Sequence, residues 1–229
     1  MGKIGWIVFS VVVVALIVGL VVWTRATNPP LNVSGVNGNS VLGATAESGD
    51  IGDNVKGKAD SKVLLVEYGD FQCPSCKSAH PNVNTLLGEY DDRIAFVFRN
   101  FPLASIHPNA KAAAAAAEAA GLQGKYWQMY NSLFDNQDSW KNLDASQRTE
   151  AFKSFAAEFG VDQAKFDADF AGDPVSKKLA FDQALGRQQG VSATPTFFLN
   201  GKQLDEATAS GIVQGDLSKI KAELDKLLK

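Results

Sequence analysis

Two cysteines, Cys73 and Cys76, are the side chains best suited to covalent chemistry, and the sequence of 229 residues contains no other cysteine. They stand in the segment Phe71-Gln72-Cys73-Pro74-Ser75-Cys76. A separation of two residues is typical of a dithiol that cycles between a reduced and a disulfide form. Such a pair exchanges its disulfide with the thiols of another molecule. We therefore expect thiol–disulfide exchange at these two residues.

A strand and a helix are needed to position the pair. The apolar run Val63–Tyr68 predicts a buried strand, and residues 73–90 predict a helix with Pro74 in its first turn. Free N–H groups at a helix start favour a negative charge, so the pKa of Cys73 should be low. Because Pro74 has no N–H, those of Ser75 and Cys76 remain to face the sulfur. We predict that Cys73 is the exposed attacking sulfur and Cys76 the shielded resolving sulfur.

Other uses of the two cysteines explain the sequence less well. A structural disulfide would close a small ring and contribute little stability. A metal site could add His80, one turn beyond Cys76, but His107 is the only other histidine. Haem attachment is excluded because Lys77 stands where that motif needs a histidine. We expect neither a metal nor a cofactor at this pair.

Composition and charge favour a globular protein and argue against one that binds nucleic acid. Apolar residues make up 45% of the chain, which is typical of a globular protein. The formal net charge is −3 and no long basic run occurs, so nucleic acid is not an expected partner.

The N-terminus carries a long apolar segment, from Ile4 to Trp23. About 20 helical residues match the thickness of a bilayer, so residues 1–24 are predicted to be a transmembrane signal anchor. A cleaved signal peptide is the main alternative, although Thr24-Arg25-Ala26 is only a weak cleavage site. The charges of Lys3 and Arg25 nearly balance, so they do not decide the orientation. A disulfide persists outside the cytosol, so we expect the large domain there.

The rest of the chain divides into a linker and one domain. Residues 25–50 are rich in Asn, Gly, Ser and Pro and predict a flexible linker. Within 51–229, a second strand at Ile94–Phe98 completes a β–helix–β unit. Helical patterns then fill about 104–190, with an aromatic stripe predicted to be core. Strand Thr196–Leu199, a tight turn at Asn200-Gly201 and an amphipathic C-terminal helix follow.

These motifs carry a family resemblance. Cys73-Pro74-Ser75-Cys76-Lys77, with Pro81 five residues after the second cysteine, resembles the active-site helix of thioredoxin-fold proteins. VEYGDFQCPSC, FPL, HPNA, AAEAA, QGKYWQMYNSLF and GVSATPTFFLNGK, in this order, resemble the DsbA-like thiol–disulfide oxidoreductases over about residues 50–229. The resemblance implies an α/β thioredoxin-like fold with a helical insertion. It also implies an enzyme that introduces disulfide bonds into exported proteins.

The resemblance also implies roles for further residues. Thr194-Pro195 matches the cis-proline that faces the dithiol, with the Thr194 backbone pairing with an extended substrate. Glu67 matches a buried acid that could accept the Cys76 proton, although a solvent-facing strand residue is the alternative. Ser75 stands where a histidine can add positive charge, so the oxidising strength stays open. His107 also matches a family position, at a helix start, where we expect a structural role.

The resemblance leaves the direction of exchange open. We expect a single-pass membrane protein that oxidises cysteine pairs in unfolded or folding exported proteins, with a quinone-linked membrane partner that reoxidises it. A disulfide reductase or isomerase on the same fold differs only in redox poise. A binding or chaperone module with an inert disulfide is a third reading.

Overall fold

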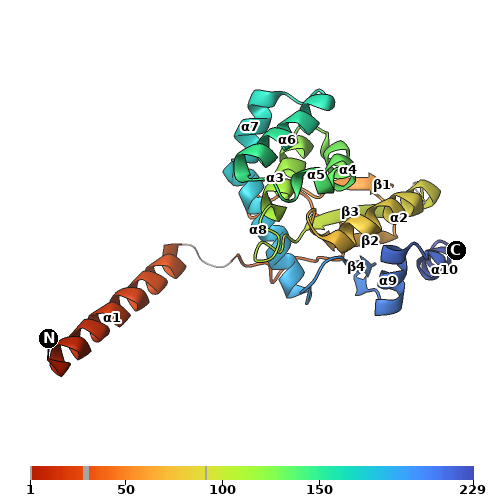
Figure 1. The fold of residues 1–229 in the computed structure, drawn as a ribbon. Coiled ribbons are helices and arrows are strands. Elements are labelled where there is room, and N and C mark those ends of the chain that lie inside the picture. The colour runs from red at the N-terminus through yellow and green to blue at the C-terminus, as the bar shows by residue number, and fades with distance from the viewer. Residues whose placement is uncertain (1, 28–30, 91) are drawn as a thin grey trace. The chain divides into compact units, whose positions relative to one another are not determined.

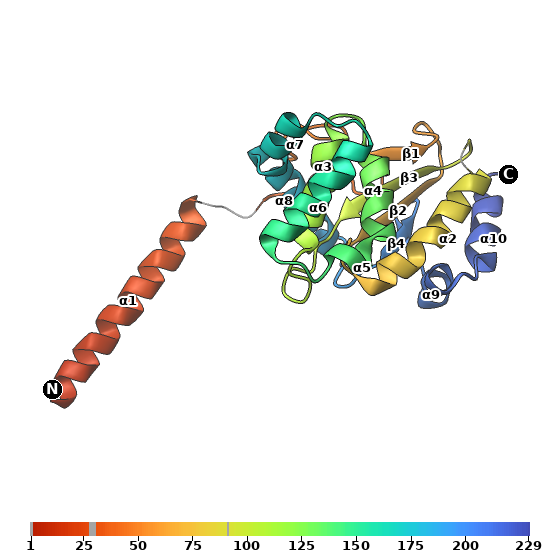
Figure 2. The same cartoon turned by 45° about the horizontal axis from the view of Figure 1, so that its top comes forward.

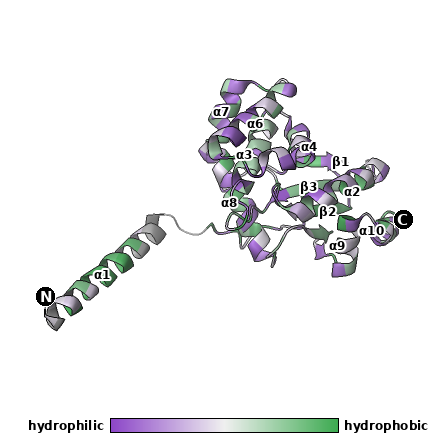
Figure 3. Ribbon diagram, viewed as in Figure 1, coloured by the Kyte–Doolittle hydropathy of each residue, from purple (hydrophilic) through white to green (hydrophobic). Residues whose placement is uncertain are grey.

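The computed structural model describes residues 2–27, 31–90 and 92–229, in two compact units that divide between Asn32 and Val33. The first unit contains helix α1 (Lys3–Thr27). Figure 3 shows that apolar residues follow one another along α1, and large side chains such as Trp6 and Trp23 are exposed. The predicted helix is therefore present. Within the described residues, however, none of the helices has the length and apolarity to cross a bilayer, so the predicted span is not supported.

The second unit is built on a five-stranded sheet (Figure 1). The strands lie in the order β1-β3-β2-β4-β5. Strands β2 and β3 are parallel, and the other neighbours are antiparallel. The predicted β–helix–β unit is thereby confirmed. The strands are β1 (Val55–Gly57), β2 (Leu64–Gly69), β3 (Ala95–Asn100), β4 (Thr196–Leu199) and β5 (Lys202–Gln203).

Helices surround this sheet in two groups. Helix α2 (Pro74–Tyr90) connects β2 to β3, and α9 (Glu206–Gln214) and α10 (Ser218–Leu227) follow the last strand. Figures 1 and 2 show α3, α6 and α7 gathered on the side away from α9 and α10. The insertion predicted at about 104–190 is thus present. It comprises α3 (Ala110–Gly121), α4 (Tyr126–Asp135), α5 (Gln137–Trp140), α6 (Ala145–Glu158), α7 (Gln163–Phe170) and α8 (Asp173–Gln188).

Strand β2 is buried on both faces, which determines where its one acidic side chain lies. Leu65 belongs to the large apolar core that also holds Cys76 and the buried face of α2. Leu64 and Tyr68 belong to a smaller core on the opposite face of the sheet. Side chains alternate along a strand, so Glu67 shares the face of Leu65. Glu67 therefore lies on the side of the sheet that α2 covers.

The predicted turn between the last two strands is confirmed. Asn200 and Gly201 both have positive φ, 46° and 78°. This backbone matches the twist of a two-residue hairpin and is best tolerated by Asn and Gly. The Asn200 side chain also accepts a hydrogen bond from the Leu64 N–H at 2.7 Å, which attaches the hairpin to β2.

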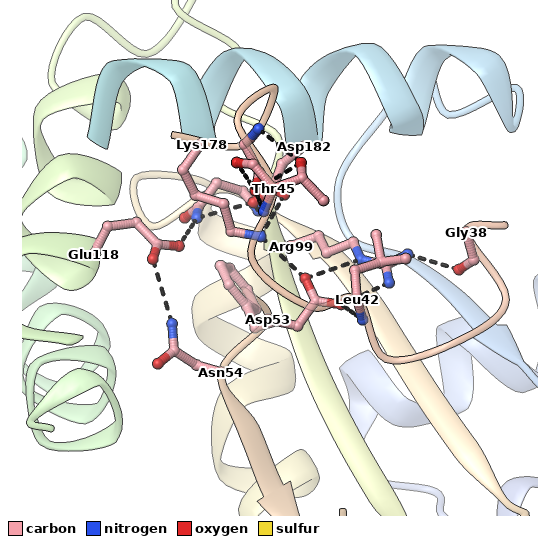
Figure 4. Close-up of polar contacts among 12 residues, drawn as sticks. Gly38, Leu42, Thr45, Asp53, Asn54, Arg99, Glu118, Lys178 and Asp182 are labelled. Atoms are coloured by element: carbon pink, nitrogen blue, oxygen red, sulfur yellow. Dashed lines mark hydrogen bonds and ion pairs between the residues drawn. The ribbon is translucent and has the colours of Figure 1, made fainter. Parts of the chain in front are cut away.

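The predicted linker, 25–50, ends earlier than its composition indicated. From Val33 the chain belongs to the folded unit, and we call residues 33–53 the strap. The buried Arg99 guanidinium donates to the Gly38 carbonyl at 2.6 Å (Figure 4). It also donates to the Ser40 carbonyl at 2.8 Å. A buried cation must be hydrogen-bonded, and the strap supplies the acceptors. The polar composition of the strap does not reveal that its carbonyl groups bind Arg99.

Buried ion pairs join the strap to β3 and α8. Asp53 pairs with Arg99 at 2.7 Å and with Lys178 at 3.0 Å, and Lys178 pairs with Asp182 at 2.8 Å (Figure 4). Burial tends to raise the pKa of Asp53, but the two cations outweigh it and lower that pKa. Burial raises the pKa of the neighbouring Glu118 to about 8. This ion cluster ties together segments that are far apart in sequence.

Candidate active site

The loop that carries the dithiol is organised by Asp70, at the end of β2. Its Oδ1 accepts a hydrogen bond from the Gln72 N–H at 2.7 Å, and its Oδ2 accepts one from the Leu103 N–H at 2.9 Å. Its carbonyl accepts the Cys73 N–H at 3.0 Å. His107 Nδ1 lies 2.7 Å from Asp70 Oδ2, which agrees with the structural role expected for this histidine. One buried carboxylate therefore sets the backbone path into Cys73.

A side chain of the insertion holds the same loop from the other side. Gln137, which is buried on α5, donates from Nε2 to the Phe71 carbonyl at 2.8 Å and to the Cys73 carbonyl at 3.1 Å. The Cys73 carbonyl also accepts the Lys77 N–H at 3.1 Å, which forms the first turn of α2. Cys73 therefore stands at the start of α2, as predicted, and the helical insertion helps to fix it there.

The two sulfurs differ strongly in their acidity. The pKa of Cys73 falls from 9.0 to about 5. The largest cause is a hydrogen bond with the Cys76 side chain, and Thr194 and the N–H groups of Cys76 and Ser75 add to it, against burial. The pKa of Cys76 is raised well above 9.0, chiefly by burial. The structure thus gives Cys73 the character of a thiolate and Cys76 that of a thiol.

The two cysteines differ less in solvent exposure than the sequence predicted. The two cysteines are not bonded to each other in the structure, and Cys73 is exposed by 6% and Cys76 by 0%. Cys73 is therefore nearly buried, whereas the sequence predicted an exposed sulfur. Pro74 and Ser75, the two residues between the cysteines, are exposed. Solvent therefore reaches this part of the dithiol loop at Pro74 and Ser75.

The loop opposite the dithiol lies where the resemblance implied. The Thr194-Pro195 peptide is cis. The Cys73 Sγ donates to the Thr194 carbonyl at 3.4 Å, so this backbone group directly contacts the attacking sulfur. The residues before it, Ser192 and Ala193, are exposed.

Glu67 is a buried acid, and the solvent-facing alternative is wrong. Its exposed fraction is 1%, and its Oε2 has no hydrogen-bond partner among the described residues. Burial, followed by the charge of Cys73, raises the pKa of Glu67 to about 8. Its charge in turn contributes to raising the pKa of Cys76. At neutral pH this carboxyl group is protonated and lies close enough to both cysteines to affect them.

The histidine considered as a third ligand is engaged elsewhere. His80 is buried on α2, and its Nε2 lies 2.9 Å from Asn131 Oδ1 on α4. Its ring stacks on Phe134 with 5.1 Å between centroids. His80 therefore helps to pack α2 against the insertion.

Comparison with known proteins agrees with this geometry. A family model described as thioredoxin matches residues 50–215. The chain belongs to the thioredoxin family. A curated relative, the Na(+)/H(+) antiporter NhaA 1 of Mycolicibacterium vanbaalenii, is 38% identical over 151 residues, which are 65% of this chain and 23% of that protein. The chain thus spans about a quarter of the length of that relative.

Solved structures extend the likeness to the DsbA-like thiol–disulfide oxidoreductases. BdbD from Bacillus subtilis superposes with a TM-score of 0.63 at 23% identity, covering 82% of this chain and 98% of that one. α-DsbA1 from Wolbachia pipientis gives a TM-score of 0.62 at 23% identity, covering 77% and 90%. The DsbA-like fold with its helical insertion, which the sequence motifs predicted, is confirmed.

Three residues of this site were missing from the predicted set. Asp70 and Gln137 act through hydrogen bonds to the backbone of the dithiol loop. Tyr130, which the sequence placed only in an aromatic stripe, has a buried hydroxyl near Glu67 that finds no hydrogen-bond partner within the described part of the chain. A buried polar residue inside an apolar pattern is the one signal that could have indicated Tyr130.

Proposed function

We propose that this thiol–disulfide oxidoreductase works as an oxidase, which passes its Cys73–Cys76 disulfide to cysteine pairs of exported proteins. The observation that supports this direction is that the pKa values of the two sulfurs are shifted in opposite directions. The pKa of Cys73 is lowered to about 5, whereas that of Cys76 is raised. A thiolate exists only in the reduced enzyme, so a more stable thiolate makes the disulfide easier to reduce.

The size of this effect follows from the acidity of Cys73. A pKa of about 5 in place of 9.0 stabilises the reduced form at pH 7 by roughly 2.7 kcal/mol. For a two-electron couple this corresponds to roughly +60 mV. The stabilisation is absent below pH 5 and develops as the pH rises through that value. Ser75 contributes an N–H to it but brings no charge.

The residues of the site support a balanced exchange. A substrate thiolate attacks the Cys73 sulfur, the Cys73–Cys76 bond breaks, and its electron pair leaves on Cys76. The neutral Glu67 carboxyl then gives its proton to the Cys76 sulfur. A second substrate thiolate displaces Cys73 from the mixed disulfide. The substrate leaves with a disulfide, and the enzyme holds the Cys73 thiolate and the Cys76 thiol. The Glu67 carboxylate then takes up a proton that the substrate thiols released, which restores the neutral form that its raised pKa favours.

The substrate chain would lie beside the Thr194-Pro195 loop. The Thr194 carbonyl contacts the Cys73 sulfur, so an extended segment that pairs with this backbone brings its own cysteine to Cys73. Pro74 and Ser75 are exposed, which leaves an approach to the dithiol open.

We further propose that residues 51–229 work outside the cytoplasm and that α1 associates them with a membrane. The support is the row of large exposed apolar side chains on α1, since such surfaces bind lipid or protein. A disulfide donor also persists only in an oxidising compartment. Its electrons need an acceptor, for which we propose a quinone-linked membrane partner. Fractionation of cells expressing residues 1–229 and residues 33–229 tests the membrane association.

Oxidation of a dithiol peptide tests the enzymatic role. The oxidised enzyme should oxidise a reduced two-cysteine peptide in one turnover. The Cys76→Ala variant, mixed with the oxidised peptide, should trap a mixed disulfide, because the Cys73 thiolate attacks the peptide disulfide and no second enzyme thiol resolves it. The Cys73→Ala variant should trap none. A binding module with an inert disulfide would leave the peptide reduced in every case. A reductase or isomerase would instead favour the reduced peptide at equilibrium.

A further inference from the structure

Two buried polar atoms lie beneath the dithiol without hydrogen-bond partners among the residues that the structure describes. They are Glu67 Oε2 on β2 and the Tyr130 hydroxyl on α4. Each residue is only 1% exposed. Buried polar groups are nearly always paired, so two unpaired groups in one region need an explanation.

The fold brings these two residues to the same place. Phe98 is the neighbour of Glu67 on β3, and Phe197 is its neighbour on β4. The ring of Tyr130 packs edge-on against Phe98, with 5.1 Å between centroids, and against Phe71, with 5.8 Å. The insertion thus delivers the Tyr130 hydroxyl to the apolar surroundings of Glu67.

Electrostatics agree with this placement. Burial raises the pKa of Tyr130, and the negative charges of Glu67 and Cys76 raise it further. The hydroxyl therefore stays protonated and keeps an O–H to donate. It is close enough to both groups to respond to a charge on either of them.

We propose that Tyr130 is a positioning residue for Glu67, whose hydroxyl donates a hydrogen bond to the Glu67 carboxylate when the Glu67 proton has passed to Cys76. The inference rests on the proposed exchange, in which Glu67 protonates the leaving sulfur. That transfer leaves a negative charge in an apolar site, where an O–H donor is the group that stabilises it. Reoxidation runs this transfer in reverse, with the Glu67 carboxylate, once formed, accepting the proton of Cys76.

Few other titratable groups face this site. Helix α2 contributes Cys76 and His80, and the ring of His80 lies 5.2 Å from that of Tyr130. Cys73 lies just before α2, and its charge acts on Glu67. On the two strands beside Glu67 the facing residues are phenylalanines, which do not titrate. Tyr126, one turn before Tyr130 on α4, donates to the Phe98 carbonyl at 3.4 Å instead.

The Tyr130→Phe variant removes only the hydroxyl and tests the proposal. Without the donor, the Glu67 carboxylate is harder to form, so the pKa of Glu67 should rise by about one pH unit. Infrared difference spectroscopy of the carboxyl band follows this titration directly in the reduced protein. Single-turnover oxidation of a dithiol peptide should slow roughly tenfold, because the proton donor has become weaker.

Two further variants make the test decisive. Tyr126→Phe, the matched control on α4, should leave the Glu67 titration unchanged. In the Glu67→Gln background, Tyr130→Phe should cause no further slowing, because its target is absent. An unchanged Glu67 titration in Tyr130→Phe would overturn the proposal, even if the melting temperature falls. The titration needs no substrate, so it stands independently of a failure of the proposed oxidase activity.

Discussion

Glu67 should reduce the stability of the folded protein at neutral pH, and the Glu67→Gln variant makes this effect measurable. The carboxyl has an ordinary pKa of 4.5, and burial raises it to about 8 in the folded state. A raised pKa in an acid means that folding favours the neutral form. Its contribution to stability is therefore full below pH 4.5 and is lost as the pH rises towards 8. The glutamine amide stays neutral throughout and avoids this loss.

The magnitude follows from the same two values. At pH 7 the unfolded carboxyl is ionised and the folded one is not, which costs roughly 3 kcal/mol of the free energy of unfolding. The reduced Glu67→Gln protein should therefore be more stable than the reduced parent by about 3 kcal/mol at pH 7. The difference should shrink towards zero near pH 4.5 and grow no further above about pH 8.

Urea denaturation of both reduced proteins between pH 4.5 and 8.5 is the assay, with equal slopes showing that the same surface unfolds. Glu158→Gln, at an exposed position on α6, is the matched control and should change little at any pH. A stability difference that stays constant across this pH range would refute the reasoning, because it would show that the carboxyl does not titrate upon unfolding.

Three other changes test further parts of the structure. Arg99→Met removes one cation that pairs with the buried Asp53 carboxylate, and it should lower the free energy of unfolding by about 3–5 kcal/mol in urea denaturation. The control Lys165→Met breaks a more exposed pair and should lower it by less than about 1 kcal/mol. Gln137→Leu removes two buried hydrogen bonds to the dithiol loop and should lower stability by about 2 kcal/mol. Ser75→His adds positive charge beside the thiolate and should lower the pKa of the attacking sulfur, as read from thiolate absorbance; an unchanged titration would contradict an electrostatic role for this position.

The sequence allowed the core of the site to be predicted because its signals are local. The spacing of Cys73 and Cys76, with Pro74 between them, defines a helix start that needs no tertiary information. The strand before it and the Asn200-Gly201 turn were equally local, and the structure has both. Placing Thr194-Pro195 beside Cys73 required the family resemblance, since 121 positions separate the contacting residues.

What could not be predicted depends on contacts between distant segments. The strap has a polar composition typical of a linker, yet it folds over the domain because Arg99 needs carbonyl acceptors. The short strand β1 and helix α9 have too few residues to give a clear periodic pattern. Tyr130 fitted a helical aromatic stripe, and this pattern gives no information about the place of its hydroxyl.

The acidity of Cys73, measured together with its redox equilibrium, tests the central claim most directly. Thiolate absorbance of the reduced protein should titrate with a pKa of about 5. In Cys76→Ala the titration of Cys73 should move upward, because the hydrogen bond with the Cys76 side chain is the largest cause of the low pKa. Equilibration with glutathione should then give a potential well above that of thioredoxin, which lies at roughly −270 mV. A titration near the ordinary 9.0, together with a potential as low as that of thioredoxin, would contradict the proposal that this enzyme is an oxidase.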